Sequence, residues 1–228
     1  MQLVINFCLL YFIYSFLGWI MEVIFIRITT KKWINRGFLI SPICPIYGCG
    51  CLLLISLLSW YDNDLFAIFL GSVFICSLLE YFTSYFLEKI FKARWWDYSQ
   101  YRYNINGRIC LETMLPFGLF GTLIVGFVDP FFLEVLDKIS FEFKVTIAII
   151  FIFLHISDLI ISFKTVSSIK GKVNGLEGDN TEEIKIQIKK LISGSYFARR
   201  LLKAFPHLLQ KIVRFNINDL NLFARIRK

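Results

Sequence analysis

The sequence predicts an all-α, polytopic membrane protein with about five transmembrane helices. Three observations support this fold class. Of the 228 residues, 57% are hydrophobic, above the ~45–50% that is typical of soluble domains. The apolar residues occur in blocks with at most one charge each, and the basic residues gather in alternate connections between the blocks.

Five apolar blocks have the length of a membrane-crossing helix. A helix needs about 20 predominantly apolar residues to cross the ~30 Å hydrocarbon core. The first block has no basic start and no small-residue cleavage pattern, so it is not typical of a signal peptide. The predicted spans are residues 3–26, 43–60, 65–87, 109–128 and 145–163, within a transmembrane domain of residues 1–168.

The basic residues predict the orientation. The first and third connections and the segment from residue 164 onward together hold 23 of the 25 lysines and arginines. Because cytoplasmic connections are enriched in basic residues, we expect these regions and the carboxyl terminus inside, and the amino terminus outside. The net charge of +8 follows mainly from this asymmetry, so the composition does not indicate a nucleic-acid partner.

Four of the five spans hold one acidic residue each, at similar depths. A charged side chain in the middle of a span costs roughly 2.5–3.5 kcal/mol, and such groups usually face a polar interior. The pattern predicts a cytoplasm-facing cavity for a substrate or a coupling ion. The alternative is that the acids pair with basic residues merely to hold the helices together. The four residues are Glu22, Glu80, Glu112 and Asp158.

The second span has no acidic residue but begins with the irregular sequence SPICPIYG. Pro42 and Pro45 lack an N–H donor and disfavour helix at the residue before them. Lipid cannot satisfy the carbonyl groups that this leaves free, so we expect the entry, including Tyr47, to line the cavity. A helix that simply starts at a proline is the alternative.

Two connections on the predicted cytoplasmic side share an unusual composition. RWWDYSQYRYNINGRICLE combines aromatic residues suited to the headgroup zone with an Asn-Gly pair that favours a tight turn, and KKWINRGFLISP repeats its Trp, Asn, Arg and Gly content. We expect both to cover the cavity as lids, with arginines facing the carboxylates. An interfacial anchor would also explain the aromatic residues. The arginines are Arg36, Arg94 and Arg108, and the lid residues are Asn35, Gly37, Trp95, Trp96, Asp97, Asn106 and Gly107.

The remainder of the chain reads as a linker, residues 169–180, and a basic amphipathic cytoplasmic tail, residues 181–228. Phe197, Leu201 and Phe205 recur at helical spacing beside basic residues. Such a segment commonly lies on an anionic membrane surface, and docking to a cytosolic partner is the alternative.

Catalytic and metal-binding patterns are missing from the sequence. The six cysteines have no metal-ligand spacing, and only two histidines, His155 and His207, occur. There is no Gly-x-x-x-x-Gly-Lys-Ser/Thr nucleotide loop. We therefore expect no metal and no cofactor, and the sequence favours a protein that is not itself an enzyme.

Four motifs occur in order along the chain: FIYSFLGWIMEVIF, NRGFLISPICPIYG, LLEYFTSYFLEKIFKARWWDYS and NINGRICLE. With them the chain resembles the type IV ABC-transporter permease family, a group of small bacterial integral membrane proteins. The tail pattern SYFARRLLKAFPHL is also similar to family members. The family pattern matches at Glu22, Asn35, Arg36, Gly37, Pro45, Tyr47, Gly48, Glu80, Glu88, Trp95, Trp96, Asp97, Asn106, Gly107, Arg108 and Glu112.

The resemblance implies a multi-pass transport protein of the bacterial cell membrane. It implies a permease subunit that works with a separate cytosolic ATPase, because this chain has no nucleotide loop of its own. Five spans are few for a permease, so we also expect a homodimer. Two alternatives remain open: a non-catalytic assembly or regulatory membrane protein, and a membrane enzyme that acts on lipid headgroups.

Overall fold

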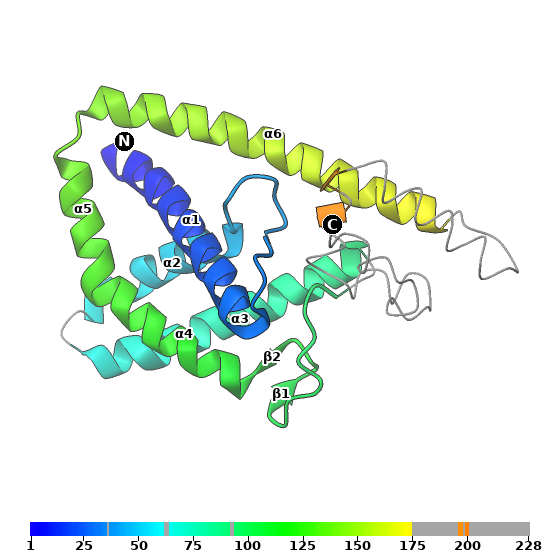
Figure 1. Ribbon diagram of the computed structural model, residues 1–228. Helices are drawn as coiled ribbons and strands as arrows, with labels where there is room; N and C mark the ends of the chain where they lie inside the picture. Colours follow the sequence, from blue (N-terminus) through cyan, green and yellow to red (C-terminus); the bar gives the residue numbers. More distant parts are fainter. Residues whose placement is uncertain (36, 62–63, 92–93, 175–195, 198, 201–228) are drawn as a thin grey trace, which may run out of the picture.

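The computed structural model describes residues 1–35, 37–61, 64–91, 94–174, 196–197 and 199–200 (Figure 1). Within these residues the chain is mostly helical, with a single two-stranded hairpin between the third and fourth helices. The elements are α1 (Gln2–Thr30), α2 (Pro45–Leu58), η1 (Ser59–Tyr61), α3 (Leu65–Phe91), β1 (Asn104–Ile105), β2 (Ile109–Cys110), α4 (Leu111–Leu123), η2 (Ile124–Val128), α5 (Asp129–Asp137) and α6 (Phe141–Asn174).

Four of the helical segments described by the structure are long and apolar enough to cross a membrane. They are Gln2–Thr30, Leu65–Phe91, Leu111–Asp137 and Phe141–Ser168. They correspond to the first, third, fourth and fifth predicted spans. The prediction of a multi-pass helical membrane protein is thereby confirmed, whereas the orientation of the chain stays a prediction.

The second predicted span, residues 43–60, differs from the other four. It forms a shorter apolar helix, Pro45–Tyr61. The 14 residues of α2 reach about 21 Å at ~1.5 Å per residue, less than the ~30 Å hydrocarbon core. Cys44 is extended before Pro45, with φ −118° and ψ 98°. The proline-rich entry therefore starts the helix two residues later than predicted, and its last turn, η1, is 3₁₀-helical.

The fourth predicted span, residues 109–128, differs at both ends. Its first two residues form β2, and the helix continues beyond residue 128 through η2 and α5. In the π-helical η2, the N–H of Asp129 bonds the carbonyl of Ile124, five residues earlier. This wider turn directly precedes Pro130, which lacks an N–H donor, and prolines and π-bulges are both sites at which helices bend. The expected connection of residues 129–144 is therefore mostly helix.

The last described helix, α6, is longer than the predicted fifth span of residues 145–163. It begins at Phe141 and continues to Asn174, so it includes the first residues of the predicted linker. The remainder of that linker, and the predicted tail apart from residues 196–197 and 199–200, lie outside the described residues.

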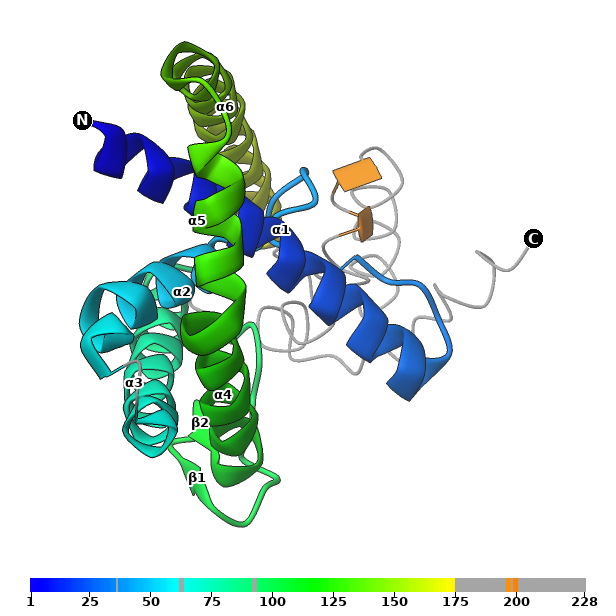
Figure 2. The ribbon, with the colours of Figure 1, turned by 90° about the vertical axis from the view of Figure 1, so that its left-hand side faces the viewer.

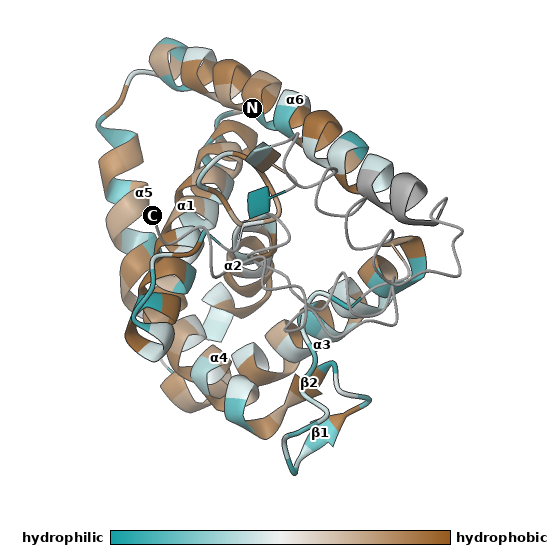
Figure 3. Ribbon diagram, turned by 45° about the vertical axis from the view of Figure 1, so that its right-hand side comes forward, coloured by the Kyte–Doolittle hydropathy of each residue, from teal (hydrophilic) through white to brown (hydrophobic). Residues whose placement is uncertain are grey.

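The helices form two groups that meet at α2. α1 packs against α2, α5 and α6, and α3 packs against α2 and α4. Figure 1 shows α4, η2 and α5 as one long bent helix, from which the chain folds back into α6. Figure 2 shows α2 and α3 side by side, on one side of that long helix. In Figure 3 the helices are mostly brown, the hydrophobic colour, whereas teal and brown alternate along the β1–β2 hairpin.

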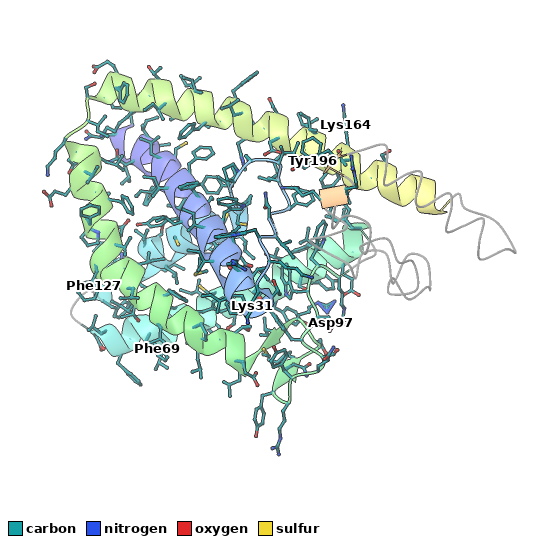
Figure 4. The ribbon with its side chains drawn as sticks, in the orientation of Figure 1. Lys31, Phe69, Asp97, Phe127, Lys164 and Tyr196 are labelled. Carbon is teal, nitrogen blue, oxygen red and sulfur yellow. The ribbon has the colours of Figure 1, made fainter. Side chains whose placement is uncertain are left out.

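Small residues allow close helix packing in this chain. A Cβ at Gly121 of α4 would lie 2.2 Å from Oγ of Ser72 on α3, and one at Gly118 would lie 2.4 Å from the ring of Phe69, which is labelled in Figure 4. A Cβ at Gly18 of α1 would lie 2.3 Å from the ring of Tyr47 on α2. Membrane helices gain van der Waals contact in this way, because lipid provides no hydrophobic force between them.

Candidate functional site

A buried polar stripe follows one face of α3. Its members are spaced three or four residues apart, so they lie on the same side of the helix. Ser77 is 5% exposed, Glu80 9% and Ser84 3%. Glu88 continues the stripe toward the end of the helix and is partly buried. Polar side chains inside such an apolar helix require partners from neighbouring segments.

Glu80 receives a partner from the segment between α3 and the hairpin. The hydroxyl of Tyr98 donates a hydrogen bond to Oε1 of Glu80 over 3.2 Å. Burial, first, and then the charge of Glu80 and this hydrogen bond raise the pKa of Tyr98 above its usual value. Tyr98 therefore remains a hydrogen-bond donor. The second oxygen of Glu80, Oε2, is buried and has no hydrogen-bond partner among the described residues.

Glu22 of α1 receives an equivalent partner from α2. The hydroxyl of Tyr47 donates to Oε1 of Glu22 over 2.6 Å. The ring of Tyr47 lies directly over Gly18, where a Cβ would collide with it. The proline-rich entry to α2 thus positions Tyr47 against Glu22, whereas the expectation that this entry lines a cavity stays a prediction.

The two pairs are close to each other. Glu22 acts electrostatically on Glu80, and both carboxylates contribute to the raised pKa of Tyr98. We call Glu22, Tyr47, Glu80 and Tyr98 the carboxylate–tyrosine cluster. It joins α1, α2, α3 and the segment before the hairpin. In the part of the chain that the structure describes, no lysine or arginine forms an ion pair with either carboxylate.

The predicted arginines pair with a different acid, Glu88. Nε of Arg94 lies 3.0 Å from Oε2 of Glu88, and Nη2 of Arg108 lies 2.8 Å from the same oxygen. The guanidinium of Arg108 also lies over the rings of Tyr81 and Tyr85, 5.5 Å from each centroid. These contacts fix both arginines at the end of α3, so the structure does not bring them to the carboxylate–tyrosine cluster.

A folded hairpin holds Tyr98 in place. Asn106 and Gly107 have positive φ values of 54° and 66°, as the sequence predicted for a tight turn. β1 and β2 pair antiparallel across this turn. The backbone N–H of Tyr98 donates to the carbonyl of Gly107 over 2.8 Å, so the turn positions the tyrosine directly.

The other residues of this segment brace the hairpin. Nε1 of Trp96 donates to the carbonyl of Arg108 over 3.0 Å. Oδ1 of Asp97, labelled in Figure 4, accepts the N–H of Ser99 over 3.0 Å. The indole of Trp95 is buried against Phe38 and Phe91. The aromatic residues of this segment therefore contribute to internal packing and hydrogen bonding.

The first predicted lid, the loop between α1 and α2, is tied down by Asn35 and Asp158. Oδ1 of Asn35 accepts hydrogen bonds from Nε1 of Trp19 over 2.9 Å and from the N–H of Gly37 over 2.8 Å. Asp158 of α6 accepts the N–H groups of Ile40 over 2.9 Å and Ser41 over 2.8 Å.

Asp158 also accepts the hydroxyl of Ser162 over 2.9 Å. The carboxylate of Asp158 therefore anchors the backbone of the loop between α1 and α2. Arg36 lies outside the described residues.

Glu112 lies apart from the buried acids. It is exposed in the first turn of α4 and forms no ion pair in the described part of the chain. Of the four predicted carboxylates, the structure thus brings Glu22 and Glu80 together, gives Asp158 a separate backbone-anchoring position and leaves Glu112 on the surface.

Sequence reasoning missed several buried polar residues. It treated Tyr98 as an interfacial aromatic residue, and it placed Asp129 in a connection. Asp129 is buried and accepts the hydroxyl of Tyr14 over 2.9 Å. Lys144 is 1% exposed and donates to Oδ1 of Asn6 over 3.0 Å. The four-residue spacing from Ser72 through Cys76, Glu80, Ser84 and Glu88 was the available signal for the α3 stripe.

Comparison with known proteins gives one result. Residues 9–163 match the model of a family described as "Putative ABC-transporter type IV". The match includes the whole carboxylate–tyrosine cluster, whereas the tail, which also resembled family members, lies beyond it. No curated protein and no solved structure matched the chain. Because the matched residues make up more than half of the sequence, the chain belongs to this ABC-transporter type IV family.

Proposed function

We propose that this chain is the membrane subunit of a transport system in the bacterial cell membrane, powered by a separate cytosolic ATPase. The family match and the four span-like helices support a membrane transport role. The subunit orientation expected from the basic residues, with the carboxyl terminus inside, places the hairpin and the end of α3 toward the cytoplasm. A homodimer would supply the further helices that a translocation path requires.

The observation that carries the proposal is the carboxylate–tyrosine cluster. Two acids with no basic partner in the described residues occupy the junction of α1, α2 and α3. A structural pair would be neutralised, as Glu88 is by two arginines, because an uncompensated charge among apolar helices is costly. We therefore propose that the cluster binds the transported substrate or its coupling ion, and that cationic or zwitterionic substrates suit it.

The experiment is uptake by vesicles that contain the purified protein with any ATPase that copurifies. The vesicles are tested with a panel of cationic and zwitterionic solutes, with and without ATP. Glu80→Gln should lower uptake strongly, whereas Glu112→Gln, on the surface of α4, should leave it near the wild-type level. No uptake of any solute by well-folded protein, or equal uptake by both variants, would argue against the proposal.

A further inference from the structure

The carboxylate–tyrosine cluster has more buried acceptor capacity than its own donors satisfy. Tyr47 and Tyr98 each donate one hydrogen bond, to Oε1 of Glu22 and to Oε1 of Glu80. Oε2 of Glu80 has no partner in the described part of the chain although the residue is only 9% exposed. An unpaired carboxylate oxygen at such a depth is a costly arrangement unless something neutralises it.

Two neighbouring hydroxyl groups share this property. The Oγ atoms of Ser77 and Ser84 are buried and make no hydrogen bond to any described residue. Both serines lie on the same face of α3 as Glu80, one turn before it and one turn after it. Serine hydroxyls inside helices can bond the carbonyl four residues earlier, and neither serine does so here. Two further buried polar groups beside Glu80 thus have no partner among the described residues.

The charges around Glu80 do not supply that neutralisation. The titratable groups that face it are Glu22 from α1, Tyr47 from α2, Cys76 on its own helix and Tyr98 before the hairpin. α4 brings only the exposed Glu112. Arg94 and Arg108 are held by Glu88. The neighbours are thus acids and neutral donors, and a second negative charge beside Glu22 is disfavoured.

We propose that the Glu22–Glu80 pair is a proton-binding site, in which Glu80 carries one exchangeable proton on Oε2. This inference rests on the proposed function, since it names the coupling ion of that site. The proton converts the unpaired acceptor of Glu80 into a donor and leaves the pair with a single negative charge, on Glu22. The Tyr47 hydroxyl stabilises that remaining charge.

The test is labelling of the purified, detergent-solubilised protein with dicyclohexylcarbodiimide, an apolar reagent that attacks protonated carboxylic acids. Mass spectrometry of peptides then locates the adducts. We expect the adduct at Glu80 at neutral pH, and little at Glu88, whose carboxylate is paired with two arginines. The yield at Glu80 should fall about tenfold per pH unit once the acid has titrated. In the Glu22→Gln variant the yield of the Glu80 adduct should fall at the same pH, because the neighbouring negative charge that holds the proton on Glu80 is gone.

A comparison of the Glu80 labelling yield in sodium, potassium and choline chloride, at equal ionic strength, distinguishes a bound proton from a bound alkali cation. Unchanged labelling supports the proton. Loss of the adduct in sodium or potassium at constant pH would overturn it in favour of a metal cation. Equal labelling of Glu80 and Glu88, or an absent Glu80 adduct, would also overturn it.

An infrared measurement covers the case in which the reagent cannot enter the helices. A protonated carboxylic acid has a C=O band that is separate from the carboxylate bands. Wild-type protein should show this band at neutral pH and lose it in Glu80→Gln, whereas Glu88→Gln should retain it. A band that is absent from wild type, or unaffected by Glu80→Gln, contradicts the proposal. Neither measurement needs a substrate or an ATPase, so failure of the uptake experiment and failure of the proton site remain distinguishable.

Discussion

The hydroxyl of Tyr98 lies 3.2 Å from Oε1 of Glu80 and donates a hydrogen bond to it, across 18 residues of chain. The hairpin turn at Asn106 and Gly107 positions Tyr98 for this contact, because the N–H of Tyr98 donates a hydrogen bond to the carbonyl of Gly107. A segment outside the long helices is thereby coupled to the buried centre of α3.

The first prediction concerns the pH dependence of stability. The pKa of Tyr98 is raised in the folded protein, and that of an unfolded tyrosine is about 10. The folded state therefore holds the phenolic proton more tightly, so this contribution to stability is complete below about pH 10 and is lost as the pH rises above it. The melting temperature of wild type should fall more steeply in that range than that of Tyr98→Phe. Parallel melting curves for the two proteins would contradict the structure.

The second prediction concerns Glu88. Glu88→Gln removes the charge that Arg94 and Arg108 share, so we expect the free energy of unfolding to fall by about 1–3 kcal/mol. The matched control is Glu134→Gln, since among the described residues Glu134 pairs with Lys138 alone and both side chains are 70% exposed. The control should change little, because exposed pairs contribute weakly. Both are measured by thermal unfolding in detergent, and an equal effect would show that Glu88 does not anchor the arginines.

The third prediction concerns the contact between α3 and α4. Gly121→Ala places a methyl group 2.2 Å from Oγ of Ser72, and overpacking of this kind costs about 1–3 kcal/mol. Gly126→Ala is the control, because its Cβ would lie 3.7 Å from the nearest atom, on Leu65. The Ser72→Gly change should recover much of the loss in Gly121→Ala but not alter Gly126→Ala. Equal melting temperatures of the two alanine variants would refute the packing.

The fourth prediction concerns the hairpin turn. Gly107 has φ +66°, and a Cβ there would lie 2.6 Å from Oδ1 of Asp97, so Gly107→Ala should cost about 1–3 kcal/mol. Asn106→Gly relieves the same turn and should be tolerated. Cleavage by an added protease at the hairpin reports the difference. Equal protease resistance of Gly107→Ala and Asn106→Gly would contradict this account of the turn.

Much of the fold followed from the sequence, for physical reasons. Long apolar runs predict span-like helices because unsatisfied backbone in lipid is costly, and four of them form such helices. Pattern counting failed where single residues act: Pro45 sets the start of α2 two residues after the predicted one, and the helix continues through Pro130 after a π-turn instead of ending. The mean hydropathy of a segment does not predict either outcome.

The site was predictable only in part. Glu22, Glu80 and Tyr47 were named from residue type and depth. Tyr98 was not, because its contact with Glu80, 18 residues away, depends on the hairpin turn that holds its backbone. Glu112 occupied a similar position along its helix, but the rotation of α4 leaves it exposed. Depth along a span can be read from the sequence, whereas the direction in which a side chain faces depends on packing.

Mass spectrometry of the intact complex, released gently from its native membrane, tests the central claim that the chain is the membrane subunit of an ATP-powered transport system. The account predicts a stoichiometric ATPase bound to two copies of this chain. A complex that contains copies of this chain alone, under conditions that preserve a known ATPase–permease assembly from the same membrane, would contradict it.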